Sequence, residues 1–221
     1  MTAGETEKRK PARRYNSPRR AEQAAATRHE VLEAARELFV RNGYAATTVA
    51  DIARAARVAV DTVYATVGRK PALLREVLET AISGTDQAVP ANDRGYVALI
   101  RAAPSAREKL ALYSSAIVQI QSRLAPVYLA IRDAAATDPD SAVLWAEINS
   151  RRAANMRTFA ADLRATGELR QDLSDDEVAD IVWGMNGAEY WVLMVDDRGW
   201  SHQRFGEFLT DAWARLLLAN P

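Results

Sequence analysis

Apolar residues recur at the spacing of an α-helix along almost the whole of this chain. In the first clear stripe they fall at i, i+1, i+4, i+7 and i+8, which puts them on one helix face: Val31, Leu32, Ala35, Leu38 and Phe39. No sustained run alternates apolar with polar residues, as a half-buried strand would. The wholly apolar runs, such as 191–195 and 216–219, fall far short of the ~18 residues that a membrane-spanning helix needs. The pattern predicts an all-α protein.

Glycine, proline and polar residues divide this pattern into about nine helices. We expect them at 24–42, 49–56, 60–66, 70–82, 105–124, 126–136, 139–166, 175–196 and 201–219. Residues 84–103, which include Pro90 and Gly95, are expected to form a loop or a partly helical connection. Three regions follow from this division: a disordered arm at 1–23, an N-terminal helical domain at 24–83 and a C-terminal helical domain at 84–221.

The formal net charge of the chain is zero, but its charges are unevenly distributed. Residues 1–75 hold 15 Lys and Arg against 8 Asp and Glu, whereas residues 76–221 hold 14 against 21. A basic segment joined to an acidic one indicates a nucleic-acid-binding domain with a partner domain. Eight basic residues precede the first strong part of the apolar pattern: Lys8, Arg9, Lys10, Arg13, Arg14, Arg19, Arg20 and Arg28. The arm is either a solubilising tail or a cationic segment that reaches a DNA groove.

The composition and motifs exclude several classes of enzyme and metal site. Cys is absent and the chain has only His29 and His202, which excludes disulfides, cysteine nucleophiles and histidine-rich metal sites. No Walker loop, Gly-x-Ser-x-Gly elbow or glycine-rich dinucleotide turn occurs. His29-Glu30 begins a zinc-protease-like motif, but Glu33 stands where the second histidine is required. We expect no enzymatic activity, no cofactor and no metal.

The N-terminus is basic but lacks the apolar core of a signal peptide. Since no membrane span is expected either, the sequence predicts a soluble, cytoplasmic protein.

Residues 48–67 read TVADIARAARVAVDTVYATV and predict two short helices joined by a tight turn. The small side chain of Ala53 lets the helices cross closely. An apolar wedge beneath them is expected from Ile52, Val58 and Val63. This helix-turn-helix holds its second helix outward, where it fits a major groove about 12 Å wide.

Residues 24–80 resemble the DNA-binding domain of the TetR family of transcriptional repressors. The family pattern has a helix that ends in Phe and Gly, a threonine-rich start to the next helix, the run IAxxAGVSxxTLYxHF, and a fourth helix that begins with Lys and carries two leucines. The matching residues are Phe39, Gly43, Thr47, Thr48, Ile52, Ala53, Ala56, Val58, Thr62, Val63, Tyr64, Lys70, Leu73 and Leu74. The match covers about a quarter of the chain, and the later helices are similar in rhythm only.

The resemblance implies that residues around the turn bind DNA: Thr47, Thr48, Arg57, Val60, Asp61, Thr62, Tyr64 and Lys70. Thr48 and the first amides of its helix are expected to hold a phosphate, as are Tyr64 and Lys70. At the start of the recognition helix, Val60 or the methyl of Thr62 is expected near a thymine methyl, and Asp61 near a cytosine amino group. Two alternatives stay open: Asp61 caps its own helix, and Lys70 is an ordinary surface lysine.

Three residues depart from the family pattern. Arg57 stands where the family usually has Gly, and a left-handed backbone costs an L-residue about 1–2 kcal/mol. A remodelled turn, or a phosphate contact by Arg57, would offset that cost. Ala59 replaces the usual Ser cap, and Val67 replaces an aromatic residue. These changes leave the fold intact, but the first two leave the detailed groove contacts open.

All five tryptophans lie after residue 144, which suits a dimer core or a ligand cavity. The resemblance implies that the last two helices pair with those of a second copy, through an interface expected at Val182, Met185, Trp191, Phe205, Leu209, Trp213 and Leu216. A ligand pocket is expected among the middle helices, at Tyr113, Ile117, Tyr128, Trp145, Met156, Phe159, Trp183 and Asn186. Ordinary core packing is the alternative for each pocket residue. The mixture of side chains suggests a small apolar or aromatic effector.

Together these features predict a DNA-binding transcriptional regulator, a ligand-responsive homodimeric repressor of a palindromic operator in double-stranded DNA. There is a physical reason to expect a symmetric dimer. One recognition helix reads too few base pairs for useful specificity, whereas two helices one DNA turn apart read an inverted repeat. The alternative is a non-specific or architectural DNA-binding protein, which shares the basic arm but predicts neither an inverted repeat nor an inducer.

Overall fold

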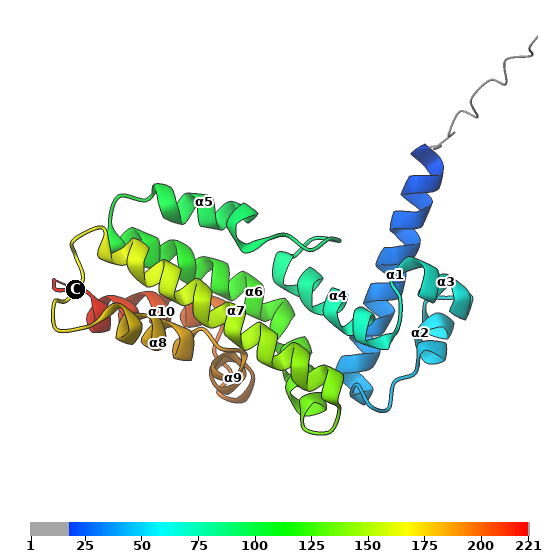
Figure 1. Cartoon of the computed structure of the whole chain (residues 1–221). Helices are drawn as coiled ribbons and strands as arrows, with labels where there is room; N and C mark the ends of the chain where they lie inside the picture. Colours follow the sequence, from blue (N-terminus) through cyan, green and yellow to red (C-terminus); the bar gives the residue numbers. More distant parts are fainter. Residues whose placement is uncertain (1–17, 221) are drawn as a thin grey trace, which may run out of the picture.

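The computed structural model describes residues 18–220, and within this range the chain consists of helices and their connections (Figure 1). The described residues form ten α-helices, where the sequence predicted about nine: α1 (Pro18–Asn42), α2 (Val49–Ala55), α3 (Val60–Thr66), α4 (Lys70–Ser83), α5 (Gly95–Ala102), α6 (Ala106–Ala135), α7 (Pro139–Arg164), α8 (Asp175–Met185), α9 (Ala188–Trp191) and α10 (His202–Leu217). A 3-10 turn, η1 (Ala91–Asp93), precedes α5, and a π-helical turn, η2 (Val192–Asp197), follows α9. The predicted all-α class is confirmed.

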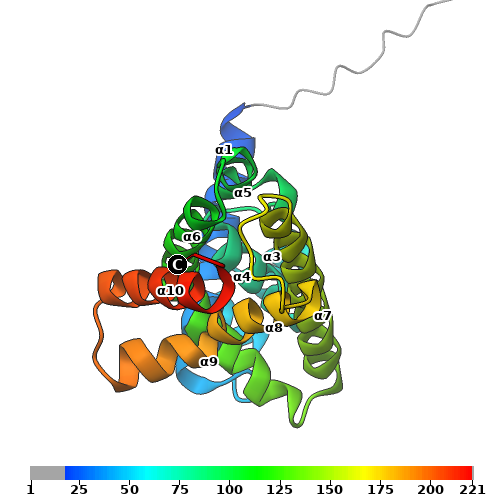
Figure 2. The ribbon, with the colours of Figure 1, turned by 90° about the vertical axis from the view of Figure 1, so that its left-hand side faces the viewer.

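Helices α1–α4 lie at one end of an elongated molecule, and α5–α10 form the body at the other end (Figure 1). The long helix α6 joins the two ends, since it contacts α1 and α4 as well as α5, α7, α9 and α10. Figure 2, which looks along the body, shows α10 and α9 on one side and α7 on the other. The buried apolar residues form one continuous core from Val31 to Leu218. None of the helices described is both long and apolar enough to pass through a membrane.

Helix α1 begins at Pro18 rather than at residue 24 as the sequence predicted. Proline fits the first turn of a helix because no backbone donor is required there. The following residues 19–26, RRAEQAAA, are strong helix formers. The predicted disordered arm at 1–23 is therefore wrong for residues 18–23, and residues 1–17 lie outside the described range.

Helix α6 continues through Pro126, whereas the sequence predicted two helices on either side of residue 125. A proline inside a helix removes one donor and crowds the preceding turn, at a cost of about 3 kcal/mol. Its neighbours Leu124, Ala125 and Val127 are all buried, while Pro126 faces solvent. Packing of the surrounding residues therefore overrides the local signal to end the helix.

The helix predicted at 175–196 is interrupted at Asn186 and Gly187. Asn186 ends α8 with φ −90° and ψ 4°, and Gly187 is extended with φ −69° and ψ 154°. The Asn186 side chain is buried. The interruption thus introduces a polar carboxamide among the helices of the body.

The substitution Pro126→Ala is expected to stabilise the protein by about 1–3 kcal/mol. It restores a helical hydrogen bond at a solvent-facing position without removing core packing. The greater freedom of alanine in the unfolded chain takes back part of the gain. Urea unfolding followed by circular dichroism, at one fixed protein concentration, measures the change.

Ser122→Ala is the matched control, because Ser122 is also exposed on α6, one turn earlier. It should change the free energy of unfolding by less than about 0.5 kcal/mol. A loss of stability in Pro126→Ala would mean that the packing of α6 requires a bend that the proline imposes.

Candidate functional site

Helices α2 and α3 form a helix-turn-helix with tightly packed inner faces. Ile52, Ala53 and Val63 are buried, and the amide of Val58 donates to the carbonyl of Ala53 at 2.9 Å. Arg57 in the turn has a φ of +57°, the left-handed conformation that glycine adopts without strain, and its side chain is exposed. Arg57 therefore adopts the backbone conformation that glycine usually has in this turn, and the strain costs about 1–2 kcal/mol of folding free energy.

The outer face of α3 carries the residues that the sequence predicted to reach DNA bases. Val60, Asp61 and Tyr64 are exposed, and Thr62 is half-buried. Ala59 supplies no side-chain hydrogen bond to cap the helix. Because α3 lies at the outer end of the molecule (Figure 1), this face is open to a partner.

Thr47 faces the interior, which corrects the prediction that it contacts DNA. Its side chain is 1 % exposed, and its hydroxyl donates to the carbonyls of Leu38 and Gly43 at 3.1 and 2.9 Å. The hydroxyl has no further proton to offer a phosphate. Thr47 instead fastens the loop before α2 to the end of α1.

Thr48 and Asp51 form a capping box at the start of α2. The Thr48 hydroxyl donates to Asp51 Oδ2 at 2.6 Å, and the Asp51 amide donates to Thr48 Oγ1 at 3.1 Å. These hydrogen bonds lower the pKa of Asp51, so its carboxylate is charged at neutral pH. The hydroxyl proton of Thr48 is thus engaged, and a phosphate at this helix end would depend on the backbone amides.

Lys70 begins α4 and lies against the loop between α1 and α2. Its ammonium is 4.1 Å from the centre of the Tyr44 ring, and Nζ donates to the Ala45 carbonyl at 3.5 Å. Burial lowers the pKa of Lys70, and the charge of Asp138 opposes this effect. Burial also raises the pKa of Tyr44 to about 12, with Asp138 and Asp140 adding to the rise. The aromatic ring therefore holds the lysine beside the loop that leads into α2.

A cavity of about 1030 Å³ lies in the body, with walls from α4, α5, α6, α7 and the α8–α9 break. Its volume is at the upper end of the range for small-molecule sites. Six of the eight predicted pocket residues line it: Tyr113, Ile117, Tyr128, Met156, Phe159 and Asn186.

Trp145 and Trp183 do not line this cavity, which corrects the prediction for these two residues. Trp145 packs against the Tyr128 ring, with 4.5 Å between ring centres. Trp183 is partly exposed on α8, and the Arg152 guanidinium lies 4.9 Å from its ring centre. Both indoles therefore support cavity residues from outside.

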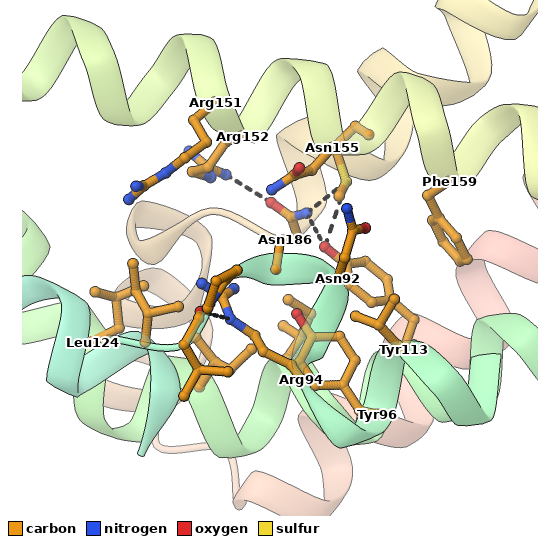
Figure 3. A pocket seen from close by; sticks show the side chains of 18 of the residues that line it. Asn92, Arg94, Tyr96, Tyr113, Leu124, Arg151, Arg152, Asn155, Phe159 and Asn186 are labelled. Atoms are coloured by element: carbon orange, nitrogen blue, oxygen red, sulfur yellow. Dashed lines mark hydrogen bonds between the residues drawn. The ribbon is translucent and has the colours of Figure 1, made fainter. Parts of the chain in front are cut away.

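A hydrogen-bond network centred on Asn186 forms one wall of the cavity (Figure 3). Asn186 Nδ2 donates to the Tyr113 hydroxyl at 2.7 Å, and Arg152 Nη2 donates to Asn186 Oδ1 at 2.6 Å. Gln121 Nε2 donates to the Asn186 backbone carbonyl at 2.5 Å. Burial raises the pKa of Tyr113, so its phenol stays neutral. The network satisfies the buried carboxamide and fixes the orientation of these polar groups.

The charged side chains of the cavity, and its amide side chains other than Asn186, were missed by the sequence prediction. They come from α4, η1, the two ends of α5, and α7, and include Arg75, Glu76, Glu79, Asn92, Arg94, Arg101, Arg151, Arg152, Asn155 and Asp162. The prediction relied on aromatic and apolar residues, because isolated charges usually mark a solvated helix face. The adjacent Arg151 and Arg152, midway along a helix that also carries buried apolar residues, were the available signal.

Five of the seven residues predicted for a dimer interface are buried within the chain itself. Each is at most 3 % exposed: Val182, Trp191, Phe205, Leu209 and Trp213. Helix α10 packs along α6, and the Trp213 ring stacks on that of Tyr113, 5.7 Å away. The prediction is wrong for these five because an apolar stripe does not tell which chain covers it. Met185 is half-buried and Leu216 is exposed.

Residues 31–77 match the sequence model of a family described as bacterial regulatory proteins, tetR family. The sequence matches no curated protein.

Solved structures of the same fold cover nearly the whole chain. The regulator FadR from Bacillus subtilis in complex with stearoyl-CoA is 20% identical over 84% of this chain and 96% of its own, with a TM-score of 0.67. A transcriptional regulator from Saccharomonospora viridis in complex with choline is 21% identical over 89% and 100%, with a TM-score of 0.66. A TetR-family regulator from Mesorhizobium loti is 20% identical over 89% and 99%, with a TM-score of 0.64.

The family match spans the end of the first helix, the helix-turn-helix and most of α4, and the structural matches extend through the body. The N-terminal domain is thus a tetR-family helix-turn-helix domain, and the chain as a whole has the fold of the TetR-family transcriptional regulators.

Proposed function

We propose that this chain is a homodimeric transcriptional repressor of an inverted-repeat operator in double-stranded DNA, released by a small, largely apolar or aromatic effector. The observation that carries the proposal is an outward-facing α3 in the same molecule as a large internal cavity bordered by α4. Residues 24–83, extended to Pro18, bind DNA in this proposal. Residues 84–221 bind the effector and the second copy.

The dimensions and exposed residues of α3 support its insertion into the major groove. An α-helix with its side chains is about 10–12 Å across, so the seven-residue α3 fits a groove about 12 Å wide. Val60 and Asp61 in its first turn are exposed and meet base edges in this proposal. Tyr64 and Lys70 bind phosphates in this proposal, and the exposed Arg57 adds a second cation to this surface.

The outward side chains of α8, η2 and α10 support a two-fold interface there. Three large apolar side chains are exposed on these elements: Trp183 at 37 %, Leu193 at 51 % and Leu216 at 41 %. Exposed apolar side chains of this size on neighbouring elements mark an interaction site. Of the interface first predicted, Met185 and Leu216 remain in this proposal. A symmetric pair then reads two half-sites about 34–36 Å apart.

Contacts of α4 support its role as the link between the cavity and DNA. Glu79 and Arg75 on α4 line the cavity. They also form ion pairs with α7, Glu79 with Arg151 at 2.6 Å and Arg75 with Glu147 at 2.7 Å. Because α4 directly follows α3 in the chain, an effector between α4 and α7 shifts the DNA-binding helices. The complexes with stearoyl-CoA and choline support a ligand site in proteins of this fold.

Selection of bound sequences from a random duplex pool tests the proposed operator. The full chain is expected to enrich an inverted repeat with half-sites about one helical turn apart. Asp61→Ala is expected to change base preference at one position in each half-site, because a carboxylate accepts from a cytosine amino group. Glu108→Ala, which removes another exposed carboxylate, in the first turn of α6 and outside both α3 and the proposed interface, is the control and should leave the motif unchanged. If the bound duplexes shared no sequence motif, the result would favour a non-specific DNA-binding protein instead.

Tyr64→Phe and Lys70→Ala are expected to weaken binding to all duplexes to a similar degree. Each removes a phosphate contact, and Lys70→Ala should also reduce the slope of log affinity against log salt by about one. Fluorescence anisotropy with the selected operator and a scrambled duplex at several salt concentrations measures both effects. Arg107→Ala, which removes an exposed arginine at the start of α6, outside the helix-turn-helix and the proposed interface, is the control. An unchanged slope in Lys70→Ala would remove this lysine from the DNA contacts.

Leu193→Glu is expected to convert the dimer to a folded monomer, because a carboxylate in an apolar interface is left without a partner. Sedimentation equilibrium measures the mass, and circular dichroism checks the fold. Leu99→Glu is the matched control, since Leu99 is also an exposed leucine but lies on α5, across the body from α8 (Figure 1). If the double variant Leu193→Glu, Leu216→Glu remained a dimer, the interface would have to lie on another surface.

A further inference from the structure

We propose that the effector is an amphipathic carboxylate whose head is bound by Arg94 and whose apolar body lies along α6. This inference rests on the proposed function, because it names the chemistry of the ligand for the same cavity. It draws on the balance of charge in the cavity wall and on the hydrogen-bond donors that remain there.

The carboxylates of the cavity wall are already neutralised. Each forms an ion pair: Glu76 with Arg28 at 2.6 Å, Glu79 with Arg151 at 2.6 Å, and Asp162 with Lys109 at 2.9 Å. Within residues 18–220, by contrast, the lining residues Arg94, Arg101 and Arg152 form no ion pair. The wall therefore carries excess positive charge, which is costly beside apolar surface and favours an anionic ligand.

Arg94 is the residue best able to bind that anion. It precedes α5, is half-buried, and donates from Nε to the Val89 carbonyl at 3.1 Å. This bond holds the side chain in position and leaves the Nη donors for a ligand. A guanidinium binds a carboxylate through two parallel hydrogen bonds, which makes the contact both strong and directional. Figure 3 shows Arg94 reaching the cavity from the side opposite α7.

Arg152 reinforces the positive potential from α7 across the cavity (Figure 3). Its partners are neutral: Nη1 donates to the Tyr128 hydroxyl at 3.1 Å, and Nη2 donates to Asn186 Oδ1 at 2.6 Å. Glu189 also lies near this guanidinium, beside Gly187, but it pairs with Arg132 at 3.6 Å. Arg152 therefore contributes mainly positive charge to the cavity. Arg94 contributes both positive charge and free hydrogen-bond donors.

The remaining wall fits the apolar part of such a ligand. Ile117 and Leu124 from α6 and Phe159 from α7 line the cavity beyond the arginines. Figure 3 shows Leu124 and Phe159 at its two ends. The volume of about 1030 Å³ accommodates a long alkyl chain or a fused aromatic body.

Calorimetric titration of the full chain with three amphiphiles of equal tail length tests the inference. The probes are dodecanoate, dodecanol and dodecyltrimethylammonium, each below its micellar concentration. Dodecanoate is expected to bind at least about ten-fold more tightly than either of the others, as one charge-assisted pair allows. The pair 2-naphthoate and 2-naphthol repeats the comparison with an aromatic body.

Arg94→Gln is expected to weaken dodecanoate binding by about ten-fold or more and to leave dodecanol binding nearly unchanged. Arg107→Gln is the matched control, because it removes an exposed arginine at the start of α6 that does not line the cavity. It should leave both affinities unchanged. Equal affinity for dodecanoate and dodecanol, tightest binding of the ammonium amphiphile, no binding of any probe, or an Arg94→Gln protein with unchanged preference would each overturn the inference.

Anisotropy of the operator complex separates this inference from the proposed function. Release of the operator by dodecanol but not by dodecanoate would keep the ligand-responsive regulator and overturn the carboxylate. Tight, Arg94-dependent binding of dodecanoate without release of the operator would support the carboxylate site and contradict its role as an effector site.

Discussion

The arrangement of this molecule depends on the burial of one long helix, α6, against both of its ends. α6 contacts α1 and α4 of the helix-turn-helix end and four helices of the body, so the two ends share one continuous core. Close-packed side chains do not compress, and a displacement beside the cavity is therefore passed to the next helix rather than absorbed. The same burial explains why α6 tolerates Pro126 in its interior.

Sequence reasoning succeeded where a few neighbouring residues decide the structure. The helix-turn-helix follows from a small residue at Ala53, apolar contacts beneath it, and a turn that accepts a left-handed Arg57. It failed where the structure depends on residues that are distant in the sequence. The break at Asn186 depends on hydrogen bonds to Tyr113 and Arg152, which lie 73 and 34 positions away. No local pattern contains those partners, and the sequence there is compatible with one uninterrupted helix.

The residues of the candidate sites were likewise predictable only where residue type or local sequence decides their position. Five of the aromatic and apolar residues predicted for a ligand pocket line the cavity, because burial follows from residue type. The arginines were missed, since burial of a charge depends on partners that periodicity does not reveal. The tryptophan and phenylalanine stripe of α10 was predicted to be an interface between two copies, but the single chain itself covers it. Thr47 matched a family position, yet its hydroxyl is used within the fold.

The ion pairs between α4 and α7 are suited to adjust the position of α4 rather than to anchor it. Its anchor is the buried apolar face formed by Leu73, Leu74, Val77 and Leu78. Arg75 and Glu147 are 44 % and 45 % exposed, and such pairs contribute about 0–1 kcal/mol. Glu79 is only 13 % exposed, so loss of its partner leaves a poorly solvated carboxylate. A ligand shifts a conformational equilibrium only by its difference in affinity for the two states. In the proposed function, the Glu79–Arg151 pair, which lies in the cavity wall and joins α4 to α7, is the contact through which the effector acts on α4.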